Sequence, residues 1–327
     1  MITFIVRRLL AMIPTLLLVS LLSFIIIELP PGDFMTSLAA NVGTSGSSMD
    51  AATVENLQRQ YGLDKPAHIR YLTWISGFVR GDFGYSLDWK RPVSELIMGR
   101  LGLTLLLSVI SLLIMWAVAI PIGIYSATHQ YSLGDNIFTL LGFLGLSVPE
   151  FVLGLFYLFI GIFVFGVSVT GLFSAEMEKA PWSLAKVLDL INHLLWPALI
   201  LGAAGMAQLI RIMRGSLLEV LGQQYITTAR AKGLREKVVI NKYAVRVAIN
   251  PLISVMGMQL PGLINGATVL GIVLTLPTTG PLFVRALLSQ DMYLAGSFLV
   301  FLSLMLMLGN LLSDIALAWA DPRIRYE

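Results

Sequence analysis

The chain has 327 residues, of which 57% are apolar and 13% are charged, and its mean hydropathy is +0.82. Soluble domains carry about 25% charged residues, so this composition excludes an ordinary soluble protein and indicates a polytopic membrane protein. The net charge is +3, but the basic residues lie near the ends of apolar runs, which argues against nucleic-acid binding. The absence of cysteine excludes disulfides, and three widely separated histidines disfavour a histidine metal site.

Six apolar runs are long enough to cross a bilayer as helices, because about 20 helical residues span the hydrocarbon. They cover residues 9–29, 101–128, 137–165, 194–213, 252–275 and 296–319. None alternates with period two, which disfavours a β-barrel. We therefore predict an all-α polytopic membrane protein with six transmembrane helices.

The first run is predicted to be a retained span rather than a signal peptide. Arg7 and Arg8 precede it, as they would in a signal peptide, but the run is too long for a signal-peptide core. It also ends in the sequence ELPPG at residues 28–32, which is not a small-x-small cleavage site.

Residues 30–100 form a long loop with seven basic and seven acidic residues. After a flexible Gly- and Ser-rich start, the sequence predicts one helix from Asp50 to Tyr61 and another from Pro66 to Val79. Apolar residues share one face of the second helix: Ile69, Leu72, Ile75 and Val79, with Trp74 and Phe78 close by. This helix either lies on the membrane surface or on neighbouring spans, or docks an external protein.

The third run is longer than one crossing needs and contains the sequence SVPE at residues 147–150. This sequence predicts a helix restart, with Ser147 as the cap and Glu150 at the positive end of the new helix. An acid inside a membrane is also a candidate functional residue. Capping or interhelix bonding, and a role in a pathway, both remain open for Glu150.

Polar and small residues in the later spans are interpreted mainly as packing groups. Arg211 and Arg214 lie one turn apart at the end of the fourth run and are expected to snorkel or to bind carbonyls and Glu219. Asn310 and Asp314 are expected to pack between helices. The fifth run holds four glycines, which indicate either a close-packed seam or a flexible wall: Gly257, Gly262, Gly266 and Gly271.

Residues 222–250, between the fourth and fifth runs, carry six basic residues and one acid. The positive-inside rule therefore places this segment, with both termini, in the cytoplasm and residues 30–100 outside. We divide the chain into residues 1–29 (cytoplasmic N-terminus and first span), 30–100 (outer loop), 101–319 (core) and 320–327 (cytoplasmic tail).

The cytoplasmic segment is predicted to contain a short helix, because residues 226–237 are rich in good helix formers. Gly222 can end the extension of the fourth span, and Gly233 can end the short helix in a left-handed conformation. Ala229 and Ala231 are small enough to let another surface approach closely. Basic side chains offer charge-assisted hydrogen bonds to an acidic groove: Arg230, Lys232 and Arg235.

Residues 214–233, RGSLLEVLGQQYITTARAKG, closely resemble the cytoplasmic loop of binding-protein-dependent ABC transporter permeases, above all the "B" permease of dipeptide, oligopeptide and nickel importers. Three further segments resemble the same family. They are the opening FIVRRLLAMIPTLLLVSLLSF, the outer-loop sequences YGLDKP and RGDFGYSL, and the ending DPRIRY. Together these matches cover nearly the whole chain in the family's order.

Several positions depart from the family pattern. The acid that begins the family's loop motif is replaced by Thr227. A glutamate and a Leu-Pro-Gly-x-Gly turn are expected after the fifth span, where this chain has Gly271 and then Leu-Pro-Thr-Thr-Gly, with Thr278 and Thr279 at its centre. The Arg-Asp pair expected afterwards is Gln290-Asp291, and the turn after the first span lacks the usual basic residue. These departures concern the substrate rather than the class of transport.

The resemblance implies half of a heterodimeric channel in the bacterial inner membrane, paired with a second permease, two ABC ATPase subunits and an extracytoplasmic solute-binding protein. Residues of the loop would then couple it to the ATPase: Tyr225, Thr228, Ala229, Arg230, Ala231, Lys232, Gly233 and Leu234. Candidate residues of the translocation pathway are Glu150, Gln259, Asn265 and Gly266. The chain has no GxxxxGK(S/T) motif, so ATP-Mg would be bound by the ATPase subunits, and no cofactor or metal is expected on this chain.

The implied function is import of peptides by alternating access, with oligosaccharide or nickel as alternative cargoes. Two other classes stay open from the residues alone. A stand-alone ion-coupled carrier would need titratable groups along its pathway, and the spans offer few. A structural membrane anchor would make the loop a topology signal that merely touches anionic lipid.

Overall fold

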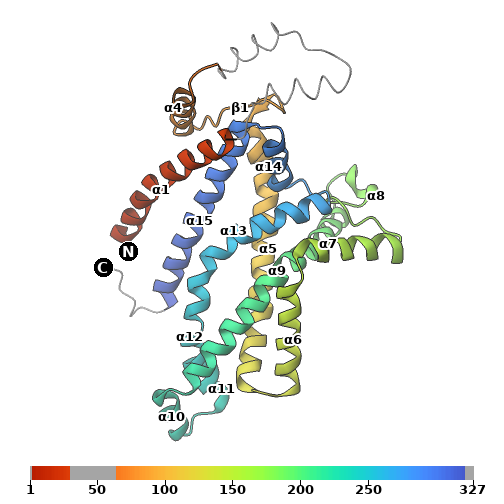
Figure 1. Ribbon diagram of the computed structural model, residues 1–327. Helices are drawn as coiled ribbons and strands as arrows, with labels where there is room; N and C mark the ends of the chain where they lie inside the picture. The colour runs from red at the N-terminus through yellow and green to blue at the C-terminus, as the bar shows by residue number, and fades with distance from the viewer. Residues whose placement is uncertain (1, 30–63, 321–327) are drawn as a thin grey trace. The chain divides into compact units, whose positions relative to one another are not determined.

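The computed structural model describes residues 2–29 and 64–320 (Figure 1). The chain falls into two compact units. One unit comprises Met1–Gly102 and Thr278–Met305, and the other comprises Leu103–Pro277 and Leu306–Glu327. Apart from one two-stranded β-pair, the regular elements in the described residues are helices, so the all-α prediction is confirmed. The predicted helix at residues 50–61 and the terminal sequence DPRIRY lie outside the described residues.

Five helices are long and apolar enough to cross a membrane, and they contain most of five of the six predicted runs. They are α1 (Ile2–Glu28), α5 (Val93–Thr128), α9 (Leu184–Leu221), α13 (Asn250–Val273) and α15 (Met292–Ala320). Both α5 and α9 extend well beyond their apolar runs, because helical hydrogen bonding continues through the polar flanks. Gly222 ends α9, as predicted.

The third predicted span is a pair of helices bent by 96° and brings the candidate spans to six if it is counted as one. It consists of α6 (Leu133–Ser147), then α7 (Glu150–Phe159) with the π-helix η1 (Ile160–Val164). The break falls at the predicted SVPE sequence, where Val148 is extended because a residue before proline avoids the helical region. The predicted Ser147 cap is wrong, since its hydroxyl donates to the Phe143 carbonyl at 2.7 Å and Pro149 takes the N-cap position.

In the first unit, α4 (Ala67–Phe78) forms at the predicted place but buries a different face. Trp74 is 4% exposed and its ring packs against those of Phe24, Tyr71 and Phe78. By contrast, Leu72 is 60% exposed and Val79 is 90% exposed. The aromatic side chains therefore hold α4 on α1, and the aliphatic stripe read from the sequence faces outward.

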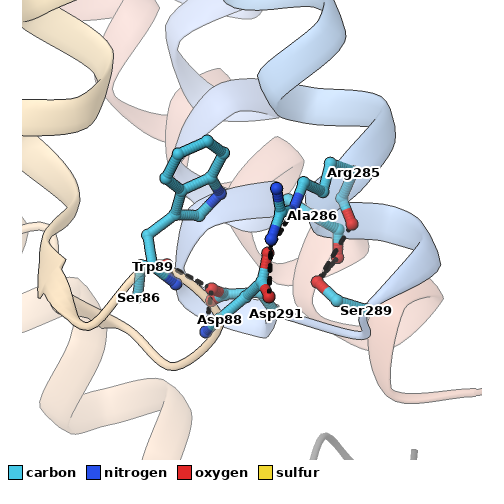
Figure 2. Close-up of polar contacts among 7 residues, drawn as sticks. All are labelled: Ser86, Asp88, Trp89, Arg285, Ala286, Ser289 and Asp291. Atoms are coloured by element: carbon cyan, nitrogen blue, oxygen red, sulfur yellow. Dashed lines mark hydrogen bonds and ion pairs between the residues drawn. The ribbon is translucent and has the colours of Figure 1, made fainter. Parts of the chain in front are cut away.

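A polar network in the same unit joins a hairpin to two helices near the C-terminal end of the chain (Figure 2). The hairpin pairs β1 (Tyr85–Ser86) with β2 (Arg91–Pro92), and the unpredicted α14 (Thr279–Leu288) precedes α15. The buried Asp291 caps α15 by accepting the Leu294 N–H, and its other oxygen accepts the Ser86 hydroxyl at 2.5 Å. Arg285 of α14 donates to Asp88 at 2.7 Å and lies over the Trp89 ring.

In the second unit, a buried ion pair ties α6 to α9. Arg214 donates through Nε and Nη2 to the two carboxylate oxygens of Asp135, at 2.9 and 2.8 Å. Asp135 is 2% exposed and also accepts the Tyr131 N–H. The prediction that Arg214 binds Glu219 is wrong. Its carboxylate partner lies 79 positions earlier in the chain, and the local sequence around Arg214 does not indicate it. Arg211 instead lies over the Phe143 ring.

The glycines of α13 form a close-packed seam at some positions only. A Cβ at Gly257 would lie 2.6 Å from the Gly309 carbonyl oxygen and from Asn310, so the backbones of α13 and α15 touch there. This contact confirms the packing role of Asn310. Gly262 has nothing within 4 Å of its Cβ position, so it takes no part in the seam.

Asp135→Ala should destabilise the protein by about 3–5 kcal/mol, because it leaves the partly buried Arg214 guanidinium without its carboxylate. The Asp135→Ala/Arg214→Met double variant should recover part of this loss. Glu219→Ala, at the exposed position expected from sequence, should change stability by less than about 0.5 kcal/mol. Thermal unfolding in detergent measures all three, and equal effects of Asp135→Ala and Glu219→Ala would contradict the assignment.

Burial raises the pKa of the Asp291 carboxyl, against the lowering effect of hydrogen bonds from Ser86 and backbone N–H groups. The native state therefore holds the proton more tightly than the unfolded chain, so this group's contribution to stability falls as pH rises above about 4. As the pH rises above about 4, the unfolding temperature of the wild type should therefore fall relative to that of Asp291→Asn. The exposed Asp64→Asn serves as the control, and a pH-independent difference between wild type and Asp291→Asn would refute the prediction.

Candidate coupling and translocation site

The predicted cytoplasmic helix is α10 (Gln224–Ala231), which follows α9 after a tight turn. The Gln223 N–H donates to the Val220 carbonyl of α9 and the Ile226 N–H donates to the Gln223 carbonyl, both at 3.1 Å. Figure 1 places α10 at one end of α9 and α8 (Ala175–Glu178) near the other. The short connection leaves α10 little freedom to move independently of α9.

Two side chains anchor α10 in a buried apolar cluster, which we call the inner core. Ile226 is fully buried and Ala229 is 5% exposed. The other buried members of the inner core come from α5, α9, η2 (Val239–Ala244), α12 (Val245–Ala248) and α13: Met115, Ala119, Ala127, Leu209, Met213, Leu217, Val220, Val239, Ala244, Ala248 and Leu252. Ala229 was expected to present a small surface to a partner, but its side chain faces this core instead.

The end of α10 has the geometry predicted for Gly233. Gly233 has φ +74°, its N–H donates to the Arg230 carbonyl at 2.9 Å, and the Leu234 N–H donates to the Ala229 carbonyl at 3.4 Å. This pair of bonds is a Schellman motif, which needs a left-handed residue at the glycine position. Nothing lies within 4 Å of a Cβ placed there, so the backbone conformation, not space, selects glycine.

The remaining predicted coupling residues lie on the exposed side of α10 and the turn after it. Tyr225 is 42% exposed and Leu234 is 37% exposed. The others in the exposed class are Thr228, Arg230, Ala231, Lys232 and Gly233. This surface combines small residues with positive charge, so it suits a contact with an acidic groove.

The cations of this surface are not equivalent. Arg230 is held by Glu236 of α11 (Glu236–Val238), with Nη2 to Oε1 at 2.6 Å, and this bond lowers the pKa of the Glu236 carboxyl. Arg230 was expected to be available to a partner, yet it already has a carboxylate. Among the described residues, Lys232 and Arg235 have no hydrogen-bond or ion-pair partner for their side chains, so they remain available.

The structure brings two of the four predicted pathway residues together. A Cβ on Gly266 of α13 would lie 2.6 Å from Glu150 Oε2, so the Glu150 carboxylate rests against the glycine backbone. Gln259 lies seven residues earlier on α13, and its Oε1 accepts the Trp116 N–H at 3.0 Å. Asn265 is exposed on another face and is not part of this group.

Sequence reasoning missed two residues of the site. Ile226 is an apolar residue three positions before Ala229, and this helical spacing could have marked the anchoring face. Trp116 gave no signal, because its partner Gln259 lies 143 positions away. Within the described residues, no three His, Asp or Glu side chains come together as a metal site.

Comparison with known proteins matches the two parts of the chain to related family models. Residues 119–326 match the binding-protein-dependent transport system inner membrane component, and residues 1–108 match the N-terminal part of such membrane components. The chain is 38% identical to the oligopeptide transport system permease protein AppB of Bacillus subtilis, over 100% of both chains. It is 35% identical to a putative peptide permease of Brucella ovis over 99% of both.

A third relative is the glutathione transport system permease protein GsiC of Shigella flexneri, 34% identical over 100% of both chains. The full-length agreement covers the candidate spans, α10 and the broken third span alike. The resemblance seen in the loop sequence is thereby confirmed at the level of the family. The chain belongs to the family of inner-membrane components of binding-protein-dependent transport systems, as a multi-pass membrane permease.

Proposed function

We propose that this chain forms half of the pathway of an ATP-driven importer for peptides. The peptide assignment is supported by the full-length relatives, which are named as oligopeptide, peptide and glutathione permeases. The partners are a second, homologous permease, two ABC ATPase subunits that bind ATP-Mg, and a solute-binding protein outside. Both termini and α10 lie on the cytoplasmic side, in keeping with the six basic residues and one acid of residues 222–250.

The single observation that carries the mechanism is the anchoring of α10 in the inner core through Ile226 and Ala229. The exposed side of α10 docks in the ATPase, and closure of the ATPase subunits displaces the helix. Because the inner core is close-packed and includes residues of α5, α9 and α13, the displacement reaches those spans. The Asp135–Arg214 ion pair makes α6 follow α9.

The cycle then follows from this coupling. ATP binding closes the ATPase subunits, moves the α10 helices of the two permeases together and opens the spans outward to accept the peptide. Hydrolysis reverses the movement and opens the pathway inward. In this scheme the chain itself transfers no phosphoryl group, and its own residues act as a lever.

Gly233→Val should weaken ATPase association, because a β-branched residue in the left-handed region costs roughly 1–2 kcal/mol and distorts the end of α10. Gly233→Asn is the matched control, since asparagine tolerates this conformation and the site has room for it. We expect several-fold less co-purified ATPase and less ATP-dependent uptake for valine, with most of both retained for asparagine. Equal loss for the two variants would mean that the Schellman geometry is irrelevant.

Ile226→Ala should uncouple the lever by loosening α10 from the inner core, at a cost of about 2–5 kcal/mol. Uptake per ATP hydrolysed should fall severalfold while the ATPase still co-purifies. Ile226→Val should show the same defect more weakly, and Val238→Ala, at a position 38% exposed on α11, should leave coupling unchanged. Proteoliposomes containing the whole complex provide both measurements. Tight coupling in Ile226→Ala would overturn the lever mechanism.

A further inference from the structure

Glu150 is a carboxylate without a partner inside the second unit. It begins α7 directly after the 96° bend from α6. No side chain or backbone group of the described residues forms a hydrogen bond or ion pair with it, and it is only partly exposed. The other acid of this bent pair, Asp135, has the bidentate Arg214 partner. Glu150 therefore stands out as a partly buried acid that lies at the positive end of the α7 dipole but has no cation or hydrogen-bond donor paired with it in the described chain.

Glu150 lies beside the middle of α9. A Cβ on Gly266 would touch both Glu150 and Leu201 of α9, so these three residues lie together. Along α9, Leu201 stands about 12 Å from His193 and about 15 Å from Arg211, at 1.5 Å per residue. The charged residues of α9 occur only toward its two ends. The Glu150 carboxylate thus lies at a depth where α9 is wholly uncharged.

An ionised carboxylate at this depth is costly in contact with lipid, so it faces protein or the water of a pathway. Gly266 makes the position possible, because a methyl group there would press on Oε2 at 2.6 Å. The glycine therefore leaves room for the carboxylate against α13. No side chain of the described residues donates a hydrogen bond to the Glu150 carboxylate, so the interhelix bond considered from the sequence is not formed.

A second unsatisfied group lies on the same face of α13. Gln259 and Gly266 are seven residues apart, which is about two turns and about 10 Å along the helix. The Gln259 carbonyl is used by Trp116, but its Nε2 is buried and has no acceptor within the described chain. The face of α13 that contacts the Glu150 carboxylate at Gly266 therefore also carries, about 10 Å away, a buried amide donor without an acceptor in the described chain.

We propose that Glu150 is a specificity-determining residue that binds the α-ammonium group of a peptide in transit, while the Gln259 amide, which is buried in this structure, donates to a peptide carbonyl once the spans separate. This inference rests on the proposed peptide cargo. A free peptide N-terminus is largely protonated at neutral pH, with a pKa near 7.7–8.0, and would supply the missing cation. An extended peptide covers about 3.3 Å per residue, so about three residues bridge the two groups. An uncharged oligosaccharide would leave the carboxylate uncompensated.

The first test compares transport of two peptides that differ only at the N-terminus, a free amine and its des-amino analogue. The complete complex in proteoliposomes is supplied with ATP on the side of the ATPase subunits and with saturating binding protein on the opposite side. For each permease variant we measure the uptake rate of the free-amine peptide divided by that of the des-amino analogue. The selectivity of the binding protein is the same for every variant, so it cancels when these ratios are compared. Glu150→Gln should lower this ratio roughly tenfold relative to wild type, as expected for loss of one charge-assisted hydrogen bond. Glu176→Gln, at an exposed acid of α8, should leave it unchanged.

The second test does not require transport. Because the chain has no cysteine, Glu150→Cys introduces its single thiol. Iodoacetamide should alkylate the thiol of the Glu150→Cys variant in the assembled complex, with the adduct read as a mass increase of this chain, and saturating peptide with its binding protein should slow this alkylation severalfold. Alkylation of the Phe156→Cys variant, on the 59% exposed side of α7, should not be slowed by the peptide.

The outcomes separate the two proposals. If wild-type complex imports no peptide in an ATP-dependent manner, the proposed function fails. If it imports peptides but Glu150→Gln keeps the wild-type ratio, and peptide does not slow alkylation at position 150, the role of Glu150 fails alone. An equal loss of uptake for both peptides with an unchanged ratio would mean that Glu150 serves protonation or packing, and would also overturn the inference.

Discussion

The packing of one short helix onto the ends of several spans is the constraint on which the proposed function of this permease depends. Ile226 and Ala229 are the two residues of α10 whose side chains are buried, and they enter a core built from α5, α9, η2, α12 and α13. A basic loop without these two anchors would still set topology and attract a partner, but a movement of the loop would not reach the spans. In the proposed mechanism the anchored helix passes a displacement by the ATPase on to the spans, because a close-packed core transmits displacement instead of absorbing it.

Some polar groups of the second unit have a hydrogen-bond or ion-pair partner in the described chain, and others have none. Asp135 and Arg214 satisfy each other and join α6 to α9, so they serve rigidity. Glu150 and the Gln259 amide nitrogen lack partners in the described chain, although unsatisfied groups are expensive where water is scarce. The broken third span makes this contrast possible, because the bend at Pro149 lets one apolar run place an acid against a glycine of α13. Such irregular backbone is tolerated at membrane depth where it lines a cavity or is buried in protein.

The first unit shows how a polar network is assembled around a single buried acid. Asp291 caps α15 and accepts the Ser86 hydroxyl, and Arg285 links α14 to Asp88 beside Trp89 (Figure 2). The departures noted in the sequence at Thr278 and Thr279 fall at the start of α14, where both residues are buried. Their place at the start of a packed helix gives them a structural role in this unit.

The sequence alone determined the features that follow from local chemistry. Apolar runs gave the spans, Val148-Pro149 gave the break, Gly222 and Gly233 gave the ends of α9 and α10, and the charge balance of residues 222–250 gave the predicted side of the membrane. The tertiary structure decided which partner each polar or small group takes: Asp135 for Arg214, Trp116 for Gln259, Glu236 for Arg230, and the inner core for Ala229. The physical reason is that spans, breaks and caps depend on a few consecutive residues, whereas burial and ion pairing depend on which distant helices meet. A periodic pattern marks a face of a helix, but only packing decides whether that face meets lipid, protein or water.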